Sequence, residues 1–440
     1  MGFFGTDGFR GKAGVELCSH HAHKIGLFLG AWAGAGKTIV VGKDPRASSD
    51  MLECALSCGV LEGGANVVQL GVVTTPAVSF EVCNLGGVAG VMISASHNPH
   101  FDNGIKLFNS NGEKMDEDTI GMLEDFLAGK KTLDEFGFEV ACGCFGQAKM
   151  HQSQDYINHL QSCGCNLLGL RVGLDCANGS ASQIAPKVFE TLGAEVFEVC
   201  NNPNGTNIND GCGSTHIQNL VDHVKKNKLD VGFAFDGDAD RCIAVDSNGQ
   251  VVDGDQIMLL CARQMQKEGR LFENRVVATV MSNLGFFAEL ERCGIDAVQT
   301  PVGDQNVYCA MKEGGYVVGG EQSGHVIFLE HARSGDGILT AIVVSKTMVE
   351  TGKKLSVLAC MKKFPQEIVN VRVQNKEEAM QSQNFLEAIE VAKKSLGKNC
   401  RVLVRPSGTE PVVRIMVEAK NKKQCQKHAN ALAEVLRQNS

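Results

Sequence analysis

The stretch Arg171-Val172-Gly173-Leu174-Asp175 is a short apolar segment that is followed by an amphipathic run at 184–192 and then by Gly193-Ala194-Glu195-Val196. An apolar segment, a helical pattern and a second apolar segment are typical of a β-strand, an α-helix and a parallel β-strand. The glycine stands where the helix should end, because a helix C-terminus often needs a left-handed residue. The stretch therefore predicts a βαβ unit.

The same order occurs twice more in the chain. In one copy the strand patterns are 38–42 and 64–68, and a helical pattern that begins at Met51 lies between them. In the other copy the strand patterns are 276–280 and 294–298, and the helical pattern is 286–292. The residues after Ile368 have a different order, with strand patterns at 368–373, 401–404 and 412–417 and helical patterns at 385–396 and 425–436.

These patterns predict the fold class. We expect an α/β protein with three similar mixed-sheet α/β domains plus a smaller C-terminal α+β domain around a central cleft. The predicted domains are 1–149, 150–249, 250–364 and 365–440. Linkers are predicted near 146–152, 248–254 and 362–366.

Composition narrows the function classes. The 440 residues carry a formal net charge of −8, which argues against nucleic acid as the main partner. The N-terminus lacks a basic region followed by an apolar run, and no apolar run of about 18 residues occurs, so no membrane partner is expected. The 18 Cys predict reduced thiols in the cytoplasm. His20, His21 and His23 predict a solvated helix face.

The sharpest motif is Asp236-Gly237-Asp238-Ala239-Asp240-Arg241, which follows the apolar strand pattern 231–235. In an extended backbone the three carboxylates would point the same way. Adjacent anions repel one another unless a cation lies between them, and Mg²⁺ prefers oxygen ligands. The calcium loop of an EF-hand is excluded because its twelfth position holds Ser247. The motif therefore predicts a magnesium site.

A second motif, Ser94-Ala95-Ser96-His97-Asn98-Pro99, follows the strand pattern 88–93 and precedes Asp102-Asn103-Gly104-Ile105-Lys106. Ligands of α/β proteins lie at the carboxyl ends of strands. Asn98-Pro99 favours a turn, which we expect to present Ser96 outward. Taken alone, the motif fits either a catalytic serine or an ordinary turn.

Two further motifs are rich in polar groups. In Gly319-Gly320-Glu321-Gln322-Ser323-Gly324-His325 the polar residues alternate, so Glu321, Ser323 and His325 would share one face of an extended segment. This arrangement suits a polyhydroxylated ligand, and a turn between strands is the alternative. Arg405-Pro406-Ser407-Gly408-Thr409-Glu410-Pro411, with Arg414 beyond it, combines guanidinium, hydroxyl and backbone N–H donors. Such donors predict a phosphate site, with a surface hairpin as the alternative.

These four motifs, in this order, resemble those of the α-D-phosphohexomutase superfamily over essentially the whole chain. The segment Asn207-Ile208-Asn209-Asp210-Gly211-Cys212-Gly213-Ser214 is similar to one in the bacterial branch that acts on glucosamine phosphates. Gln305 departs from that branch, which often carries a basic residue there, and so weakens any expectation of a cation from this loop.

The resemblance implies a role for each motif. Ser96 would be the phosphoserine, with Asp236, Asp238 and Asp240 binding Mg²⁺ together with a phosphoserine oxygen. The groups expected around the transferring phosphoryl group are Arg10, His97, Lys106 and Arg241. Glu321, Ser323 and His325 would meet the sugar. The non-reacting phosphate would be held by Arg405, Ser407, Gly408, Thr409 and Arg414.

The implied reaction interconverts glucosamine 6-phosphate and glucosamine 1-phosphate through a 1,6-bisphosphate, for UDP-N-acetylglucosamine and cell-wall precursor synthesis. Glucosamine or glucose 1,6-bisphosphate would serve as activator, the partner would be a small phosphosugar, and a homodimer is expected. Three alternatives stay open: a phosphomannomutase/phosphoglucomutase, a metal-dependent phosphatase and a non-enzymatic phosphosugar sensor.

Overall fold

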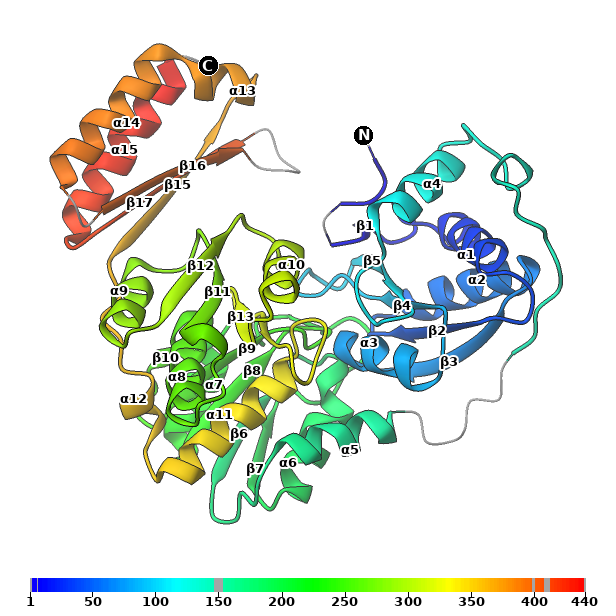
Figure 1. Cartoon of the computed structure of the whole chain (residues 1–440), viewed down its shortest axis with the longest axis horizontal. Helices are drawn as coiled ribbons and strands as arrows, with labels where there is room; N and C mark the ends of the chain where they lie inside the picture. The colour runs from blue at the N-terminus through cyan, green and yellow to red at the C-terminus, as the bar shows by residue number, and fades with distance from the viewer. Residues whose placement is uncertain (1, 6, 146–152, 398–399, 407–411, 439–440) are drawn as a thin grey trace. The chain divides into compact units, whose positions relative to one another are not determined.

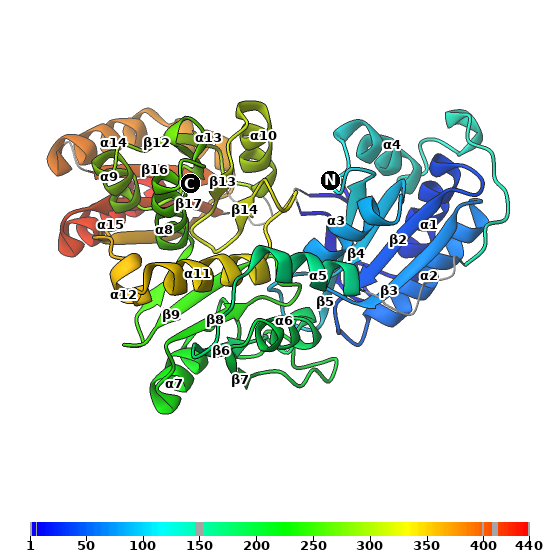
Figure 2. The same cartoon turned by 60° about the horizontal axis from the view of Figure 1, so that its bottom comes forward.

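The computed structural model describes residues 2–5, 7–145, 153–397, 400–406 and 412–438. It contains four sheets, each with its own helices, which Figures 1 and 2 show in two views. By their contacts, the residues form two compact units, one of residues 1–281 and 295–360 and the other of residues 282–294 and 361–440. Within the described ranges, no helix is both long and apolar enough to cross a membrane.

The first sheet has the order β1-β5-β4-β2-β3. Strands β4, β2 and β3 are parallel, whereas β5 and β1 add two antiparallel pairs. Every residue of β4 is buried, as expected for a strand covered on both faces. The strands are β1 (Phe9–Lys12), β2 (Thr38–Lys43), β3 (Asn66–Val72), β4 (Ala89–Ile93) and β5 (Asp102–Asn109), and the helices are α1 (Ser19–Ala33), α2 (Ser49–Glu62), α3 (Thr75–Asn84), α4 (Glu117–Leu127) and the 3-10 turn η1 (Asp134–Phe136).

Helices α1 and α2 lie side by side (Figure 1) because glycines form their contact. A Cβ on Gly26 would lie 2.0 Å from the carbonyl oxygen of Leu56, and one on Gly59 would lie 2.1 Å from that of His23. No larger residue fits at either position without moving the helices apart. The core below them is aliphatic and aromatic, with Phe28 among its fully buried residues.

The second sheet has the order β10-β9-β8-β6-β7 and combines a parallel centre with an antiparallel edge. Helix α5 of this part lies beside α11 (Figure 2). The strands are β6 (Arg171–Asp175), β7 (Glu195–Val199), β8 (Val231–Phe235), β9 (Cys242–Asp246) and β10 (Val251–Val252), and the helices are α5 (Gln154–Cys163), η2 (Ser180–Gln183), α6 (Ala185–Thr191) and α7 (Gln218–Asn227).

The third sheet has the order β12-β11-β13-β14, with only β14 antiparallel. Its strands are β11 (Arg275–Thr279), β12 (Asp296–Thr300), β13 (Val318–Gly320) and β14 (Val326–Phe328). The helices in this stretch of chain are α8 (Gly254–Lys267), η3 (Phe272–Asn274), α9 (Leu284–Arg292), α10 (Asp304–Gly314), α11 (Gly337–Thr351) and α12 (Leu355–Leu358).

The C-terminal sheet is antiparallel with the order β15-β17-β16. Helix α9 belongs to the same compact unit, where the N–H of Leu284 donates to Glu418 at 2.8 Å. Apolar residues such as Phe385 and Ile415 fill its core. The strands are β15 (Gln366–Arg372), β16 (Cys400–Pro406) and β17 (Val412–Ala419), and the helices are α13 (Lys376–Gln381), α14 (Gln383–Leu396) and α15 (Lys422–Gln438).

The three predicted βαβ units are present, and their glycines end the helices as expected. Gly64, Gly193 and Gly294 each lie one residue after the C-cap, with φ of 104°, 92° and 69°. The left-handed backbone there suits glycine.

The predicted linker at 248–254 contains a turn, because Asp246 accepts hydrogen bonds from the N–H groups of Asn248 and Gln250 between β9 and β10. Another predicted linker lies outside the described residues. Residues 146–152 are the linker that falls outside the description.

Candidate active site

Ser96 lies in the loop between β4 and β5. Its hydroxyl donates to Asp236 Oδ2 at 2.5 Å, and the residue is only 1% exposed. Its backbone is left-handed, with φ of 52°, which is uncommon for a residue with a Cβ. The expectation that the turn at Asn98 presents Ser96 outward is therefore wrong. The loop folds against the loop after β8, so the hydroxyl points into the protein.

Arg46 holds the main chain of this serine loop, which we define as residues 94–104. Its side chain is fully buried, and it donates to the carbonyl oxygens of Ser96 and Asn98 at 2.9 Å each and of Asp102 at 3.0 Å. Its Nε pairs with Asp44 at 2.8 Å. Charge-assisted bonds to carbonyl groups fix the backbone conformation that places the Ser96 hydroxyl.

Asn209 holds the same loop from the second sheet's side. Its Nδ2 donates to the carbonyl oxygens of Ser96 at 2.8 Å and Asn98 at 3.1 Å. The sequence motif at 207–214 contained this residue without indicating its contact. Arg46 gave no signal, since an arginine after a proline in a polar stretch is usually solvated.

The three aspartates of the metal loop (236–240) converge, with one oxygen from each within 4.8 Å of the other two. All three are buried. The extended backbone that we considered is absent, because the N–H of Ala239 donates to the carbonyl of Asp236 at 3.0 Å and Ala239 has a φ of 56°. A turn, and not strand alternation, brings the carboxylates together.

The electrostatics of this group favour a cation. Burial, followed by the charges of Asp240 and Asp238, raises the pKa of Asp236 to about 8. Among the described residues, Asp238 Oδ1 and Asp240 Oδ1 are buried and have no hydrogen-bond partner. Buried anionic oxygens without donors are costly, and a hard divalent cation such as Mg²⁺ would satisfy them. The residues present therefore fit a magnesium ion.

Lys106 partly neutralises the same carboxylates. Its Nζ lies 2.6 Å from Asp238 Oδ2 and 3.1 Å from Asp240 Oδ2. Burial works to lower the pKa of Lys106, but the two carboxylates outweigh burial and raise it. For Asp240, burial raises the pKa, but Lys106 and other cations hold it well below its ordinary value. Thr75, at the start of α3, also donates its hydroxyl to Asp238.

Arg10, Arg241 and His97 lie near Ser96. His97 Nδ1 is 3.3 Å from Ser96 Oγ. Burial, with the charges of Arg241 and Arg10, lowers the pKa of His97 to about 4, so the ring is neutral at pH 7. In the described part of the chain, the Nε atoms of both arginines are buried without a hydrogen-bond partner. Such guanidinium donors suit phosphoryl oxygens.

The predicted sugar loop does not form one extended face. Residues 321–325 make a turn, with Ser323 exposed and His325 4% exposed. His325 Nδ1 faces Asp240 Oδ1 at 3.7 Å, while Glu321 accepts from the N–H of Gly303 at 3.2 Å. The expectation of a shared face is therefore wrong, because the turn directs His325 to the metal loop.

The protonation of His325 follows from its hydrogen bond. Burial acts to lower the pKa of His325, whereas the carboxylates of Asp240 and Asp304 act to raise it. The N–H of Gly335, however, donates to Nε2 at 3.0 Å, and only an unprotonated Nε2 accepts. We assign the ring as neutral with the proton on Nδ1, because the hydrogen bond fixes the tautomer.

The phosphate motif lies in the C-terminal unit. Arg405 on β16 is directly opposite Arg414 on β17, so their side chains extend from the same face. Two opposed guanidinium groups repel each other and favour an anion between them. Ser407, Gly408 and Thr409 lie outside the described residues.

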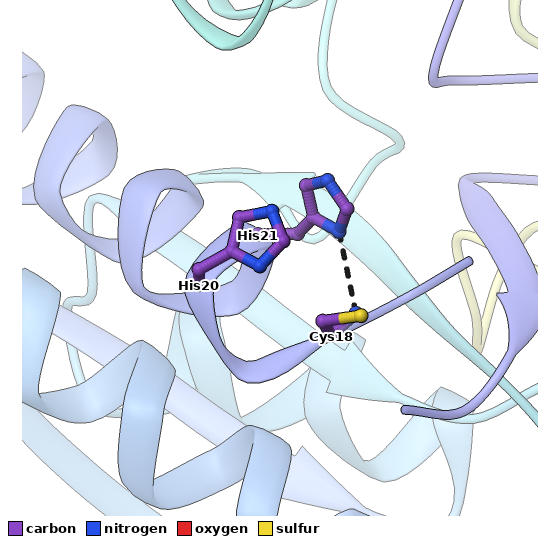
Figure 3. Close-up of side chains that lie close together, drawn as sticks. All are labelled: Cys18, His20 and His21. Carbon is purple, nitrogen blue, oxygen red and sulfur yellow. Dashed lines mark hydrogen bonds between the residues drawn. The ribbon is translucent and has the colours of Figure 1, made fainter. Parts of the chain in front are cut away.

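One further group of potential ligands has a structural explanation. Cys18, His20 and His21 lie at the start of α1 (Figure 3). His21 Nδ1 accepts from the N–H of Cys18 at 3.2 Å, and the Cys18 thiol donates to the carbonyl of Val15. These bonds cap the helix. His20 is exposed on this helix and His23 is half-exposed, as expected for a solvated face, but the ring of His21 packs against Phe3 and Phe9.

Comparison with known proteins assigns the class. The chain matches the descriptions "Phosphoglucomutase/phosphomannomutase, alpha/beta/alpha domain I" over residues 1–133, domain II over 154–249, domain III over 253–364 and the C-terminal domain over 368–435. The chain belongs to this phosphohexomutase family.

The curated relatives of the chain indicate which branch of the family it resembles most. The chain is 46% identical to phosphoglucosamine mutase of Lachnospira eligens over 442 residues, covering 99% of this chain and 98% of the relative. It is also 46% identical to phosphoglucosamine mutase of Bacillus subtilis over 441 residues, with the same coverage.

Solved structures share the fold. A phosphoglucomutase/phosphomannomutase family protein of Burkholderia thailandensis superposes with a TM-score of 0.83 at 23% identity, covering 99% of this chain and 97% of the other. N-acetylphosphoglucosamine mutase of Aspergillus fumigatus, in complex with GlcNAc-6P and magnesium, gives a TM-score of 0.71 at 17% identity, covering 99% and 95%. A variant of that fungal enzyme in complex with glucose 1,6-bisphosphate gives a TM-score of 0.68 at 18% identity, and the comparison again covers 99% of this chain and 95% of the other.

Proposed function

We propose that the protein is a magnesium-dependent phosphoglucosamine mutase, an isomerase that interconverts glucosamine 6-phosphate and glucosamine 1-phosphate in the cytoplasm. The observation that carries the chemistry is the 2.5 Å contact between Ser96 Oγ and Asp236 Oδ2 within a group of three buried aspartates. The choice of glucosamine rests on the relatives at 46% identity over the whole chain.

In this proposal Ser96 carries the phosphoryl group. The O1 hydroxyl of glucosamine 6-phosphate attacks the phosphorus and loses its proton to His97, while the bond between phosphorus and Ser96 Oγ breaks and the 1,6-bisphosphate forms. After the bisphosphate turns over in the site, Ser96 Oγ attacks the 6-phosphoryl group, the bond from phosphorus to O6 breaks, O6 takes up a proton, and glucosamine 1-phosphate leaves. Asp236, Asp238 and Asp240 would hold Mg²⁺, which would supply positive charge to the transferring phosphoryl group. Phosphoryl transfer depends mainly on such charge neutralisation and on positioning.

The other site residues have distinct proposed roles. Lys106, Arg10 and Arg241 neutralise and orient the transferring group. His97 is the neutral imidazole nearest to Ser96 Oγ, at 3.3 Å, and is suited to accept a proton. His325, Glu321 and Ser323 meet the sugar. Arg405 and Arg414, with Ser407, Gly408 and Thr409, bind the phosphate that does not react.

The proposal includes the setting of the enzyme. All 18 cysteines are free thiols, which supports a reducing compartment. We also propose a homodimer and four domains at 1–149, 150–249, 250–364 and 365–440. Light scattering and limited proteolysis test these two points.

The deciding experiment measures turnover with Mg²⁺ and a trace of glucose 1,6-bisphosphate. Glucosamine 6-phosphate is compared with glucose 6-phosphate and mannose 6-phosphate, using wild type, Ser96→Ala and the matched control Ser110→Ala, which changes an exposed serine. We expect preferred turnover of the amino sugar, its loss in Ser96→Ala only, and one phosphoryl group on wild type by intact mass. Turnover that survives in Ser96→Ala would refute the serine mechanism, and better turnover of glucose or mannose phosphate would move the enzyme to the neighbouring branch.

A further inference from the structure

A second group of potential metal ligands lies in the second sheet's loops, in Asp175, Cys200 and Cys212. One donor atom from each residue lies within 4.8 Å of the other two. Asp175 ends β6 and Cys200 follows β7, so both lie at the carboxyl edge of two paired parallel strands. Cys212 comes from the loop 207–214. Three segments distant in sequence therefore bring two sulfur atoms and one carboxylate together.

Asp175 is a buried carboxylate that is held by two backbone N–H groups. It is 0% exposed, and its oxygens accept from the N–H groups of Ala177 and Gly213 at 2.9 Å each. Among the described residues, no Lys or Arg forms an ion pair with it. Burial raises its pKa to about 6. A cation bound here would offset the cost of the buried charge.

The two thiols differ in exposure. Cys212 is 0% exposed, whereas Cys200 is half-buried. The hydrogen bond between the two thiols lowers the pKa of Cys200 and, together with burial, raises the pKa of Cys212. Cys200 is therefore the thiol that ionises more readily, and a bound metal would displace the proton of Cys212. Asn178 places its Nδ2 3.9 Å from Cys212 Sγ and its backbone N–H 2.6 Å from the carbonyl of Cys200. Such surrounding donors orient metal ligands in proteins.

We propose that Asp175, Cys200 and Cys212 bind one Zn²⁺ ion, with a water molecule on the exposed side of Cys200 as the fourth ligand. Zn²⁺ accepts sulfur and carboxylate ligands in tetrahedral sites, at about 2.3 and 2.1 Å, which separates the ligand atoms by about 3.6–3.8 Å. Small side-chain rotations bring donors within 4.8 Å onto such an ion. The sulfur atoms distinguish this site from the all-oxygen group at Asp236, which suits Mg²⁺.

A bound zinc ion would brace this part of the fold. It would tie the ends of β6 and β7 to the loop 207–214, and Asn209 in that loop donates to the carbonyl of Ser96 at 2.8 Å. The ion would therefore stabilise one of the contacts that hold the serine loop. This inference goes beyond the proposed mutase activity and does not depend on it.

Cobalt substitution tests the proposal directly. The full chain is purified under reducing conditions, stripped with a chelator and titrated with Co²⁺ in excess Mg²⁺, which occupies the oxygen ligands at Asp236. We expect a near-ultraviolet thiolate-to-cobalt charge-transfer band that saturates at one equivalent and disappears when Zn²⁺ is added. Cys200→Ser and Cys212→Ser should each lose the band. The matched controls Cys18→Ser and Cys165→Ser should keep it.

Three results would overturn the assignment. They are the absence of the band in wild type, its persistence in both Cys200→Ser and Cys212→Ser, and a Cys200–Cys212 disulfide found by peptide mass in the metal-treated protein. If Cys212→Ser does not fold, the half-exposed Cys200→Ser decides alone. Hydrogen exchange of residues 207–214 adds an independent measurement, since Zn²⁺ should slow it in wild type and not in Cys200→Ser.

Discussion

The substitution Arg46→Lys tests whether the serine loop is held by the guanidinium group. Arg46 donates to the carbonyl oxygens of Ser96, Asn98, Pro99 and Asp102 and also pairs with Asp44. These are five hydrogen bonds from a fully buried side chain. A lysine keeps the charge but has only three donors on one nitrogen.

The expected loss follows from this difference. Two of the five bonds must be lost, and a hydrogen bond to a charged group contributes about 1.5–3 kcal/mol. The serine loop should therefore lose about 3–6 kcal/mol of local stability. The lower limit corresponds to about a 10²-fold increase in local opening, because about 1.4 kcal/mol is a factor of ten. Misplacement of Ser96 by even about 1 Å should lower kcat by about 10²-fold.

Hydrogen exchange of peptides covering 94–104 measures the local opening, and mutase turnover measures the placement of Ser96. Arg171→Lys is the matched control, because Arg171 also donates to two carbonyl groups but its side chain is 35% exposed. Arg171→Lys should change the hydrogen-exchange rates of its own neighbours by less than about tenfold, because an exposed side chain replaces a lost protein hydrogen bond with one to water. Unchanged exchange of 94–104 together with kcat within about twofold of wild type in Arg46→Lys would refute the reasoning.

Three further outcomes are expected. Removal of Mg²⁺ with a chelator should abolish turnover and readdition should restore it, because Asp238 Oδ1 and Asp240 Oδ1 are buried and form no hydrogen bond within the described part of the chain. Activity in excess chelator would contradict the magnesium site. Burial raises the pKa of Asp336 from 3.8 to about 6, so the folded protein binds this proton more tightly than the unfolded chain does. The free energy of unfolding that this proton contributes is therefore full below about pH 4 and is lost as the pH rises through 6. Asp336→Asn should remove about 3 kcal/mol of the fall in unfolding free energy between pH 4 and pH 7, and urea titrations that show the same fall in both proteins would exclude this effect. Arg414→Ala should raise KM for glucosamine 6-phosphate about 10- to 100-fold through loss of a charge-assisted bond, and steady-state kinetics with an unchanged KM would remove Arg414 from the phosphate site.

The sequence predicted the parts of the fold that depend on local periodicity. The strand pattern 231–235 coincides with β8, and the helical pattern 385–396 lies within α14. The alternation of polar residues, however, led to the wrong backbone conformation for two motifs, which were expected to be extended. Residues 236–240 and 321–325 both form turns, since the left-handed Ala239 and Gly324 reverse the chain where an extended strand was considered.

The candidate site was only partly predictable for a different reason. Ser96 and the three aspartates are chemically distinctive, so their residue types and spacing were enough to indicate them. Arg46, Thr75 and Asn209 act through contacts across about 50 to 160 residues of sequence. A single sequence contains no signal for such pairings, because they depend on how strands and loops are placed in three dimensions.

The position of Ser96 therefore requires two parts of the chain at once. Its carbonyl accepts from Arg46, which precedes α2 beside the first sheet, and from Asn209, which lies in a loop of the second sheet. Its hydroxyl donates to Asp236, which directly follows β8 of the second sheet. The left-handed backbone at Ser96 costs free energy by itself and persists only where surrounding contacts fix it. It follows that separation of the first two sheets would release the serine from its aspartates and from one of its two carbonyl donors together, so packing between them sets the geometry of phosphoryl transfer.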